Sequence, residues 1–497
     1  MIFSINSYAQ KMRCSTDQDT EFMKRLQRNV DNSFTQKAKV ARFVPVELHL
    51  VADNDGSLTL TEDEIISKMC ILNNRYADIE MHFYIAGINK IFNTTLNHRQ
   101  GLASSRTLMR NNKNEDAMNI FLVNEILQND FEPSGAAGYY TGGGNDFIVM
   151  LQSTPGDDGY TMEHEIGHHF SLAHTHFGWE GDISQGSSSG GYNPLIHGDT
   201  VTIEIITGST QAPPTEVELM DGSNCTTAGD RICDTPPDYG FGQACSCCTM
   251  RWDVWDRNGD MIIPMLDNIM SYSQNCPENF FTDGQRDAMF EDFDSPLRSH
   301  LRTGEVTEYT PITEEVTITS PQVADKFDSF DGVLIEWDAV LNAETYVVNI
   351  SGGQQLRYET SDTEMYIEEL EPSSLYFVDV KAYNKFGTGC QNSIRVFFET
   401  GTGSTSTNET ESINDINIYP NPVKNAEDLV IDYNSDKNIV SKIRLHNLQG
   451  KVVELINTTF AAGNNKFKIN TSALISGLYI LEIETEEGII SEKIIVE

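Results

Sequence analysis

The stretch Thr161–His176 carries histidines at a spacing that could hold a metal ion. His164 and His168 are four residues apart, so on a helix their imidazoles project from one face and can bind one tetrahedral Zn2+. Glu165 would then lie beside the metal, where its carboxylate could accept a proton from water. Because six residues separate His168 from His174, the helix must end soon after His168 if the third ring is to reach the same ion. Three histidine ligands with one open position are typical of a catalytic zinc site.

The complete pattern resembles the zinc-binding consensus of the metzincin proteases, which also have a Met-turn downstream of the third histidine. Ser171 stands where that consensus has glycine, so a serine must adopt the positive φ of the helix end at a cost of about 1–2 kcal/mol. Met270 matches the Met-turn and is expected to form an apolar floor beneath the metal. Tyr272, two residues later, could direct its hydroxyl at a developing oxyanion. The sequence therefore predicts a zinc peptidase.

Further segments resemble those of the pappalysin-like metzincins. They are GDRICDTPPD (Gly229–Asp238), DNIMSY (Asp267–Tyr272), Cys276 and FTDGQ (Phe281–Gln285). The resemblance extends over about Pro45–Leu301 and implies a secreted zinc endopeptidase whose loops are stabilised by Ca2+. Three aspartates of the first segment are candidate calcium ligands: Asp230, Asp234 and Asp238.

Two other functions compete with this interpretation. In the first, the third metal ligand is a downstream glutamate such as Glu180, as in thermolysin-like proteases; the presence of His174 and Met270 argues against it. In the second, the chain is a catalytically inactive surface-binding or adhesive protein built on a protease fold. Such a protein would have no need of Glu165 beside its histidines, which argues against the second alternative.

The cysteines bear on the compartment, because six of the nine lie within Cys225–Cys276. Such clustering indicates disulfides in a secreted protein or metal binding in a cytosolic one, and the histidines already account for the zinc. The pappalysin resemblance suggests two disulfides that link the Cys225 loop and Cys276 to the stretch Cys245–Cys248, and it leaves the pairing open. We therefore expect a secreted, disulfide-bonded protein.

Cys14 lies in a polar segment, residues 11–44, that we interpret as a pro-segment. A thiolate from Cys14 could occupy the fourth position at the zinc and keep the enzyme latent until the segment is removed. The alternative is a free or paired thiol at the surface. Basic residues that offer cleavage points ahead of the first core strand are Lys37, Lys39 and Arg42.

The composition limits the partners and the compartment. The chain has 497 residues, a hydrophobic content of 39% and a formal net charge of −40, which suits several folded domains and argues against a nucleic-acid partner. The acidity fits an extracellular protein with carboxylates for calcium, and a solvated surface explains most of it. No stretch approaches the roughly 18–20 apolar residues of a membrane-spanning helix. Residues 1–10 end like a signal peptide and are interpreted as its remnant.

The protease region, placed at residues 45–305, is expected to combine a small twisted sheet with helices. Alternating or continuous apolar runs predict strands at Val46–Leu50, Met81–Ile85, Ala117–Val123 and Phe147–Leu151. A capping box at Thr61–Glu64 opens a helix, and Gly284–Leu301 is expected to form the last helix. The predicted fold class is α+β, a metzincin domain followed by two all-β sandwiches.

The first of these sandwiches is expected at residues 310–400, which show short alternating strands. Trp337, Tyr346 and the segment Leu370–Tyr376 resemble a fibronectin type III domain, with Tyr376 as its tyrosine corner. Residues 401–412, GTGSTSTNETES, have the composition of a flexible linker.

The second sandwich is expected at residues 413–497. Three blocks in order, NIYPNP (417–422), LHNLQGK (445–451) and SGLY (476–479), resemble the C-terminal sorting domain of type IX secretion. The resemblance implies that the type IX machinery is a partner, besides protein or peptide substrates. It also implies a protein that is secreted or attached to the cell surface.

Overall fold

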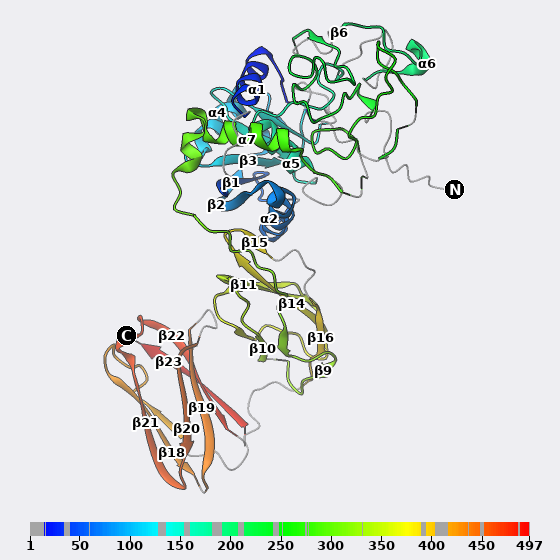
Figure 1. Cartoon of the computed structure of the whole chain (residues 1–497). Coiled ribbons are helices and arrows are strands. Elements are labelled where there is room, and N and C mark those ends of the chain that lie inside the picture. Colours follow the sequence, from blue (N-terminus) through cyan, green and yellow to red (C-terminus); the bar gives the residue numbers. More distant parts are fainter. Residues whose placement is uncertain are drawn as a thin grey trace. The chain divides into compact units, whose positions relative to one another are not determined.

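The computed structural model describes residues 14, 16–33, 40–58, 60–127, 136–153, 160–180, 191–206, 213–241, 248–250, 252–273, 276, 278–330, 332–388, 394–402, 416–435, 437–447, 452–485 and 488–496. The chain forms two compact units, one of residues 1–311 with 385–390 and the other of residues 312–384 with 391–497. The first unit combines helices with a five-stranded sheet, and the described part of the second consists of strands and one 3-10 turn (Figure 1). The predicted α+β fold class is confirmed.

The first unit contains most of the helices. They are α1 (Thr20–Ser33), α2 (Glu62–Tyr76), η1 (Ala77–Ile79), α3 (Thr94–His98), α4 (Ala103–Asn112), α5 (Thr161–His169), α6 (Pro194–His197), α7 (Asp283–Asp294) and η3 (Pro296–Arg302). Its strands are β1 (Arg42–Ala52), β2 (Met81–Phe92), β3 (Met118–Val123), β4 (Gly138–Thr141), β5 (Phe147–Leu151), β6 (Ile205–Ile206), β7 (Thr215–Glu216) and β15 (Gly387–Thr388).

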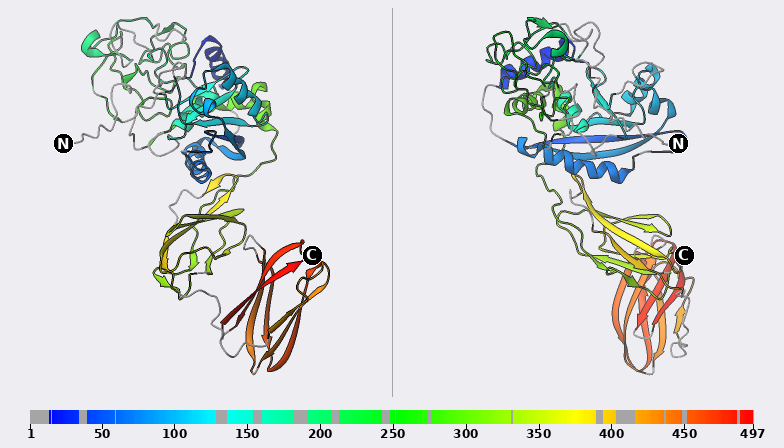
Figure 2. Two further views of the ribbon diagram at one scale, coloured as in Figure 1. Left: turned by 180° about the vertical axis from the view of Figure 1, so that it is seen from behind. Right: turned by 90° about the vertical axis from the view of Figure 1, so that its right-hand side faces the viewer.

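The central sheet of the first unit has the strand order β2-β1-β3-β5-β4. The first four strands in this order are parallel, and β4 runs antiparallel to β5 at the edge. All side chains of β3 and β5 are buried, as expected of a sheet covered on both faces. Helices α1, α2, α5 and α7 contribute to the core on one face, and α3 and α4 to the core on the other (Figure 2).

Local sequence signals set the ends of two helices. Thr61 caps α2, and together with Glu64 it forms the predicted capping box. The helical segment predicted over Gly284–Leu301 is present in two pieces, because α7 ends at Asp294 and the 3-10 helix η3 begins at Pro296. Proline has no N–H to donate and its ring clashes with the preceding turn, so the α-helix does not continue through it.

The region between α5 and α7 has few regular elements and a hydrophobic core of its own. Its described disulfides are Cys225–Cys233 and Cys248–Cys276. The second agrees with the expected link of Cys276 to the stretch Cys245–Cys248. The expected link of the Cys225 loop to that stretch is wrong, because the loop folds back and places the Cα atoms of Cys225 and Cys233 5.0 Å apart, within bridging distance. Cys245 and Cys247 lie outside the described residues.

The second unit begins with a β-sandwich. Its strands are β8 (Ile318–Ser320), β9 (Asp325–Lys326), β10 (Val333–Trp337), β11 (Thr345–Gly352), β12 (Leu356–Thr360), β13 (Glu364–Ile367), β14 (Leu375–Asn384) and β16 (Val396–Glu399). They form sheets of order β13-β10-β8 and β12-β11-β14-β16-β9, which share one core. The hydroxyl of Tyr376 accepts a hydrogen bond from the N–H of Glu371 at 2.7 Å, which is the predicted tyrosine corner.

A further set of strands follows in the same unit. They are β17 (Ile416–Tyr419), β18 (Asp428–Ser435), β19 (Ile439–Asn447), β20 (Val452–Phe460), β21 (Gly463–Asn470), β22 (Gly477–Thr485) and β23 (Gly488–Val496), with the turn η4 (Thr471–Ala473). They form sheets of order β17-β18-β21 and β20-β19-β22-β23 around one core.

The interpreted signal remnant at 1–10 and most of the linker at 401–412 lie outside the described residues. None of the helices in the described ranges has the length and apolar character needed to cross a membrane.

Candidate metal centre

Helix α5 ends where the third predicted ligand requires it to end. Its last residue is His169, and Ser171 has a φ of +73°, the positive value expected at this position. The N–H of Ser171 donates to the carbonyl of His168, and the N–H of Leu172 to the carbonyl of Gly167, both at 2.9 Å. These two bonds form a Schellman motif. The chain therefore returns toward the face of the helix that carries the first two histidines.

Three buried imidazoles converge at this turn. The Nε2 atom of His168 lies 3.1 Å from the Nε2 atoms of both His164 and His174. The Nδ1 atoms of His164 and His168 face the carbonyls of Ile269 and Leu172, each at 2.7 Å. Because a carbonyl only accepts, each Nδ1 must carry the proton, and each Nε2 presents a lone pair. Lone pairs this close repel one another unless a cation lies between them, so the site fits a metal ion held by the three Nε2 atoms.

The protonation states of these side chains also suit a metal. Burial lowers the pKa of His164 to about 4, and burial likewise lowers the pKa of His168 and of His174. The neutral imidazole is the form that binds a metal ion. The ligands are therefore ready to bind without releasing protons.

Met270 lies directly against the helix that carries the first two ligands. A Cβ on Gly167 would be 2.5 Å from Met270 Sδ, so only glycine allows the helix to approach the Met-turn this closely. The turn is held by Asn268, whose side-chain oxygen accepts from the N–H of Met270 at 2.8 Å and whose amide pairs with Gln285 of α7. Met270 is fully buried there and packs against α5 at Gly167, between His164 and His168.

Glu165 is almost completely buried, with 1% of its surface exposed. Burial raises the pKa of its carboxyl group to about 8, and hydrogen bonds from Cys14 and Thr16 act in the opposite direction. Strand β4 lies against it, since a Cβ on Gly138 would be 2.9 Å from Glu165 Cγ. A carboxylate of raised pKa beside a metal site is suited to accept and return a proton.

The segment that precedes α1 enters this site. Cys14 forms an isolated β-bridge with Gly138 of the edge strand β4. Its Sγ atom and the ligand atoms of the three histidines all lie within 4.8 Å of one another. Burial raises the pKa of the Cys14 thiol, as does the nearby Glu165, to whose Oε2 the thiol donates at 3.4 Å. A cation held by the histidines would oppose this shift and favour the thiolate.

Two further residues of this segment, which the sequence pattern did not predict, also contact the site. Thr16 Oγ1 donates to Glu165 Oε2 at 2.9 Å and accepts from a backbone N–H of β4 at 2.8 Å. Gln18 contacts His174 twice, with Nε2 lying 2.6 Å from Nδ1 and with Oε1 accepting from the backbone N–H at 3.0 Å. Together with Cys14 these residues occupy every second position, which places side chains of an extended chain on one side. This alternation could have predicted the two contacts from the sequence, but only if the segment were known to be extended.

Tyr272 faces the same space from the Met-turn. Its hydroxyl accepts from the N–H of Cys14 and donates to the carbonyl of Cys14, both at 3.1 Å. The centroid of its ring lies 4.7 Å from that of His174. The hydroxyl therefore reaches the backbone of a peptide that lies along β4 at the metal site.

Glu180 does not lie among the converging Nε2 atoms. Its Oε1 lies 3.2 Å from His174 Nδ1, and its Oε2 accepts from the N–H of Gly178 at 2.8 Å. Glu180 is thus placed to orient the third histidine rather than to replace it, and the thermolysin-like alternative is not supported. His176, not predicted from the sequence, stacks on His174 with ring centroids 4.8 Å apart and forms a second possible ligand group with His174 and Glu180.

The three candidate calcium ligands do not gather their oxygens in one group. Asp234 binds the start of α7, where it accepts from the capping hydroxyl of Thr282 at 2.7 Å and from a backbone N–H at 2.8 Å. Asp230 and Asp238 are buried and accept from nearby hydroxyl and N–H groups. Burial raises the pKa of Asp230 to about 8. Burial also raises the pKa of the neighbouring Glu218, and the negative charge of Asp230 raises it further. Calcium therefore stays a prediction.

Comparisons with protein families match one segment in each of the two units. Residues 62–175 match the profile described as Metallo-peptidase family M12B Reprolysin-like, and residues 417–497 match the one described as Secretion system C-terminal sorting domain. A protein of Colletotrichum graminicola named "Extracellular metalloprotease" is 26% identical over 184 residues. The match covers 33% of this chain and spans 64% of the length of that relative.

Comparisons with solved structures find fibronectin-type domains. The FN1-FN3 domains of chicken CNTN1 have 15% sequence identity and a TM-score of 0.17, and the match covers 38% of this chain and 70% of that chain. The fn3 domain of the human collagen alpha-1(XX) chain has 17% identity and a TM-score of 0.16, with 21% and 98% covered.

The first matched segment includes α5 and all three histidines. A metallopeptidase of this kind implies a bound metal, typically zinc, and the converging imidazoles are the residues that fit it. The sorting domain indicates a protein that is secreted or held at the cell surface. The chain thus carries a metallopeptidase domain in its first unit and a secretion sorting domain in its second.

Proposed function

We propose that the first unit is a zinc-dependent endopeptidase of the pappalysin-like type, made in a latent form and exported by the type IX secretion machinery. The proposal rests above all on three buried imidazoles whose Nε2 atoms converge beside the buried Glu165. The pappalysin-like subtype rests on the motif Gly229–Asp238, which lies outside the matched segment at residues 62–175. The substrates are proteins or peptides.

The proposed mechanism assigns a role to each group at the site. Zinc held by the three histidines would polarise the scissile carbonyl and make water more acidic. Glu165 accepts the proton of the attacking water and returns it to the leaving amine. Tyr272 donates its hydroxyl to the oxyanion that develops on the carbonyl. The edge of β4, which Cys14 already bridges at Gly138, offers backbone groups to an extended substrate.

Latency is supported by the contacts of the pro-segment. Cys14 Sγ lies close enough to the three histidines to be a fourth ligand, so it blocks the position that water needs. Thr16 donates to the carboxylate of the base, and Gln18 Oε1 accepts from the backbone N–H of the third histidine. An enzyme in this form has neither a free metal position nor a free base.

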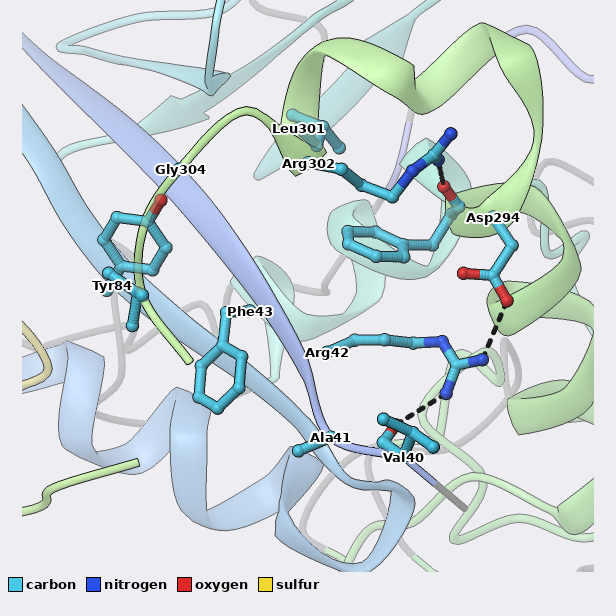
Figure 3. A pocket seen from close by; sticks show the side chains of 11 residues that line it. Val40, Ala41, Arg42, Phe43, Tyr84, Asp294, Leu301, Arg302 and Gly304 are labelled. Atoms are coloured by element: carbon cyan, nitrogen blue, oxygen red, sulfur yellow. Dashed lines mark hydrogen bonds and ion pairs between the residues drawn. The ribbon is translucent and has the colours of Figure 1, made fainter. Parts of the chain in front are cut away.

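Arg42 is the first residue of β1 and is 7% exposed. Its Nη2 donates to Asp294 at 2.8 Å (Figure 3). Its guanidinium lies 3.7 Å from the centroid of the Phe290 ring. It also lines a cavity of about 400 Å³. A buried residue in a strand is a poor protease substrate, so these contacts argue against Arg42 as the cleavage point. Lys37 and Lys39, outside the described residues, remain the proposed cleavage points.

The proposed layout keeps the remaining boundaries. It has a pro-segment from residue 11, a protease domain to residue 305, a fibronectin type III-like domain at 310–400, and a sorting domain at 413–497. Because β1 begins at Arg42, we propose a start of the protease domain there rather than at residue 45. Calcium stays proposed at Asp230, Asp234 and Asp238, and Asp234 is the weakest of these ligands because α7 already uses its carboxylate.

The decisive experiment compares trimmed wild type with Glu165→Gln, both loaded with zinc. An amide cannot serve as a base, so hydrolysis of a peptide library should fall by about 10²–10⁴-fold while bound zinc stays equimolar. The exposed Glu115→Gln is the matched control and should change neither value. Near-normal turnover of Glu165→Gln would exclude the mechanism. A trimmed wild type that binds zinc and cleaves no peptide would favour the adhesive alternative.

A further inference from the structure

Helix α1 of the pro-segment is packed into the protease domain. Phe22, Met23, Leu26 and Val30 lie on one helical face, are buried, and join the same core as α2, α5 and α7. Phe22 meets the ring of the metal-ligand candidate His168 edge-on, with centroids 6.1 Å apart. Burial of an apolar face stabilises the complex whether or not the chain continues beyond the helix.

A buried ion pair between Arg25 of α1 and Asp292 of α7 also holds the helix. Arg25 Nε donates to Asp292 Oδ1 at 2.9 Å, and Nη2 donates to Oδ2 at 3.1 Å. The side chain of Arg25 is 13% exposed and that of Asp292 is 0% exposed. The same guanidinium donates to the carbonyl of His169 at the end of α5. Two parallel charge-assisted bonds shielded from water are strong and fix the orientation of the helix.

Two more contacts tie α1 to loops that belong to the site. Asn29 Nδ2 donates to Ser171 Oγ at 2.8 Å and to Asp292 Oδ1 at 2.9 Å. Arg231, from the motif Gly229–Asp238, donates to the carbonyl of Met23 at 3.2 Å. The helix therefore contacts the turn that positions the third histidine.

The surface that receives α1 has its own internal support. Arg298 is fully buried and donates to Asp292 Oδ2 at 3.1 Å and to both oxygens of Asp146 at 2.7 and 2.8 Å. Asp292 thus keeps a guanidinium partner when Arg25 is absent, and its charge is not left alone in the core. A surface that is already organised loses little on binding, so it remains competent to hold the helix.

All these contacts lie ahead of the proposed cleavage points, because α1 ends at Ser33 and the first of those points is Lys37. A cut after α1 breaks one peptide bond and none of the contacts. We propose that residues 14–33 stay bound after this cut and act as a separable inhibitor that recognises its own protease domain through α1. The proposal rests on the proposed protease function. Activation then requires dissociation or digestion of α1.

The cut changes how inhibition depends on concentration. In the continuous chain the segment is tethered beside its binding surface, which gives it a high effective concentration. After the cut, the same contacts hold two separate molecules, so the bound fraction falls on dilution. Activity per enzyme molecule should therefore rise as the cut protein is diluted.

The test replaces residues 34–39 with the recognition sequence of a specific protease and cuts the folded, zinc-loaded chain. The freed segment should co-elute with the protease domain in size-exclusion chromatography at micromolar concentration, and activity should appear on dilution. Separate elution of the segment, or full activity at every concentration directly after the cut, would overturn the proposal. Co-elution without hydrolysis at any dilution would support the binding and count against the protease function.

A matched pair of variants tests recognition through α1. Arg25→Ala should raise the concentration at which the cut segment is half dissociated by at least about tenfold, because it leaves the buried pair incomplete. Arg28→Ala, an exposed arginine of the same helix, should leave this concentration unchanged. Equal values for the two variants would exclude the ion pair from recognition. Synthetic peptides of residues 14–33 with either substitution, titrated calorimetrically into trimmed protein, give the same comparison if a full-length variant does not fold.

Discussion

The proposed pro-segment has two parts that contact the rest of the first unit in different ways. The stretch from Cys14 to Gln18 uses polar side chains, each directed at one part of the machinery. Helix α1 uses an apolar face and the ion pair of Arg25 with Asp292, and it packs into the core. The part proposed to block the chemistry is therefore distinct from the part that packs an apolar face into the core. Substitutions in or opposite the two parts should have separable effects on activity and on binding.

The largest effect is expected at Tyr272, which faces the first part only. In the trimmed enzyme, Tyr272→Phe should lower kcat by about 10²–10³-fold with little change in KM, because one donor to the oxyanion is lost. Calorimetric affinity for residues 14–33 should also fall, because the hydroxyl makes two hydrogen bonds to the backbone of Cys14, each of which contributes about 0.5–1.5 kcal/mol. An unchanged kcat would make Tyr272 a structural residue.

Removal of the thiol should partly relieve latency. Untrimmed Cys14→Ala should be at least about tenfold more active than untrimmed wild type, because water gains access to the metal position. Its activity should stay below that of the trimmed enzyme, since Thr16 and α1 remain in place. Equal activity of the two untrimmed proteins would show that Cys14 is not a switch. If Cys14→Ala weakened binding of the cut segment more than Arg25→Ala does, the division of roles would be wrong.

A smaller effect is expected at Thr16. Thr16→Val removes the hydroxyl that donates to Glu165, and one such hydrogen bond contributes about 0.5–1.5 kcal/mol. The activity of the untrimmed chain should therefore rise only a few-fold, which initial-rate assays can resolve. Thr20→Val, an exposed threonine at the start of α1, is the control and should have no effect.

The smallest effect on binding of residues 14–33 is expected from changes at the buried carboxyl groups of Glu218 and Asp230. Asp230 precedes Arg231, which contacts α1, and the main effect of this pair is on stability. Burial raises the pKa of Asp230 to about 8 and also raises that of Glu218. A carboxyl group with a raised pKa in the folded state contributes stability below its unfolded pKa, near about 4, and this stability is lost as pH rises through about 8. Without calcium, the Tm of the zinc-loaded chain should therefore fall between pH 5 and pH 8. Calcium should restore it at pH 8.

Glu218→Gln checks this assignment, because it removes one of the two buried charges. The variant should show a flatter dependence of Tm on pH and a weaker response to calcium, both measured by thermal unfolding. Its affinity for residues 14–33 should change by no more than a few-fold, through Arg231 alone. A wild-type Tm that ignores both pH and calcium would count against calcium at this point.

The convergence of the three histidines could be predicted from the sequence because its geometry is local. Two histidines on one helical turn, and a positive φ at Ser171 before the third, follow from helix geometry and its C-terminal cap. The contacts of the proposed pro-segment could not be predicted, since Thr16 and Glu165 are 149 positions apart and Arg25 and Asp292 are 267 apart. Only the folded sheet and helices bring these pairs together.

The errors in the predicted fold have different causes. Pro296 signals the break between α7 and η3 locally, because proline cannot continue the hydrogen bonds of an α-helix. The pairing of Cys225 with Cys233 depends on how one loop folds back, which spacing alone does not determine. The all-β character of the second unit could be predicted, because short alternating strands indicate a β-sandwich wherever they lie in the chain.

The contact between Met270 and Gly167 bears on how long the site can survive in an oxidising medium. Oxidation of the thioether to a sulfoxide adds an oxygen and a dipole to a side chain whose sulfur already lies against the helix. A carbon atom on Gly167 does not fit beside that sulfur, and an added oxygen meets the same obstacle. Helix α5 would have to move and would take His164 and His168 with it. Full burial keeps oxidants away from the sulfur, so the chemical durability of the metal centre depends on how tightly one methionine is packed against one glycine.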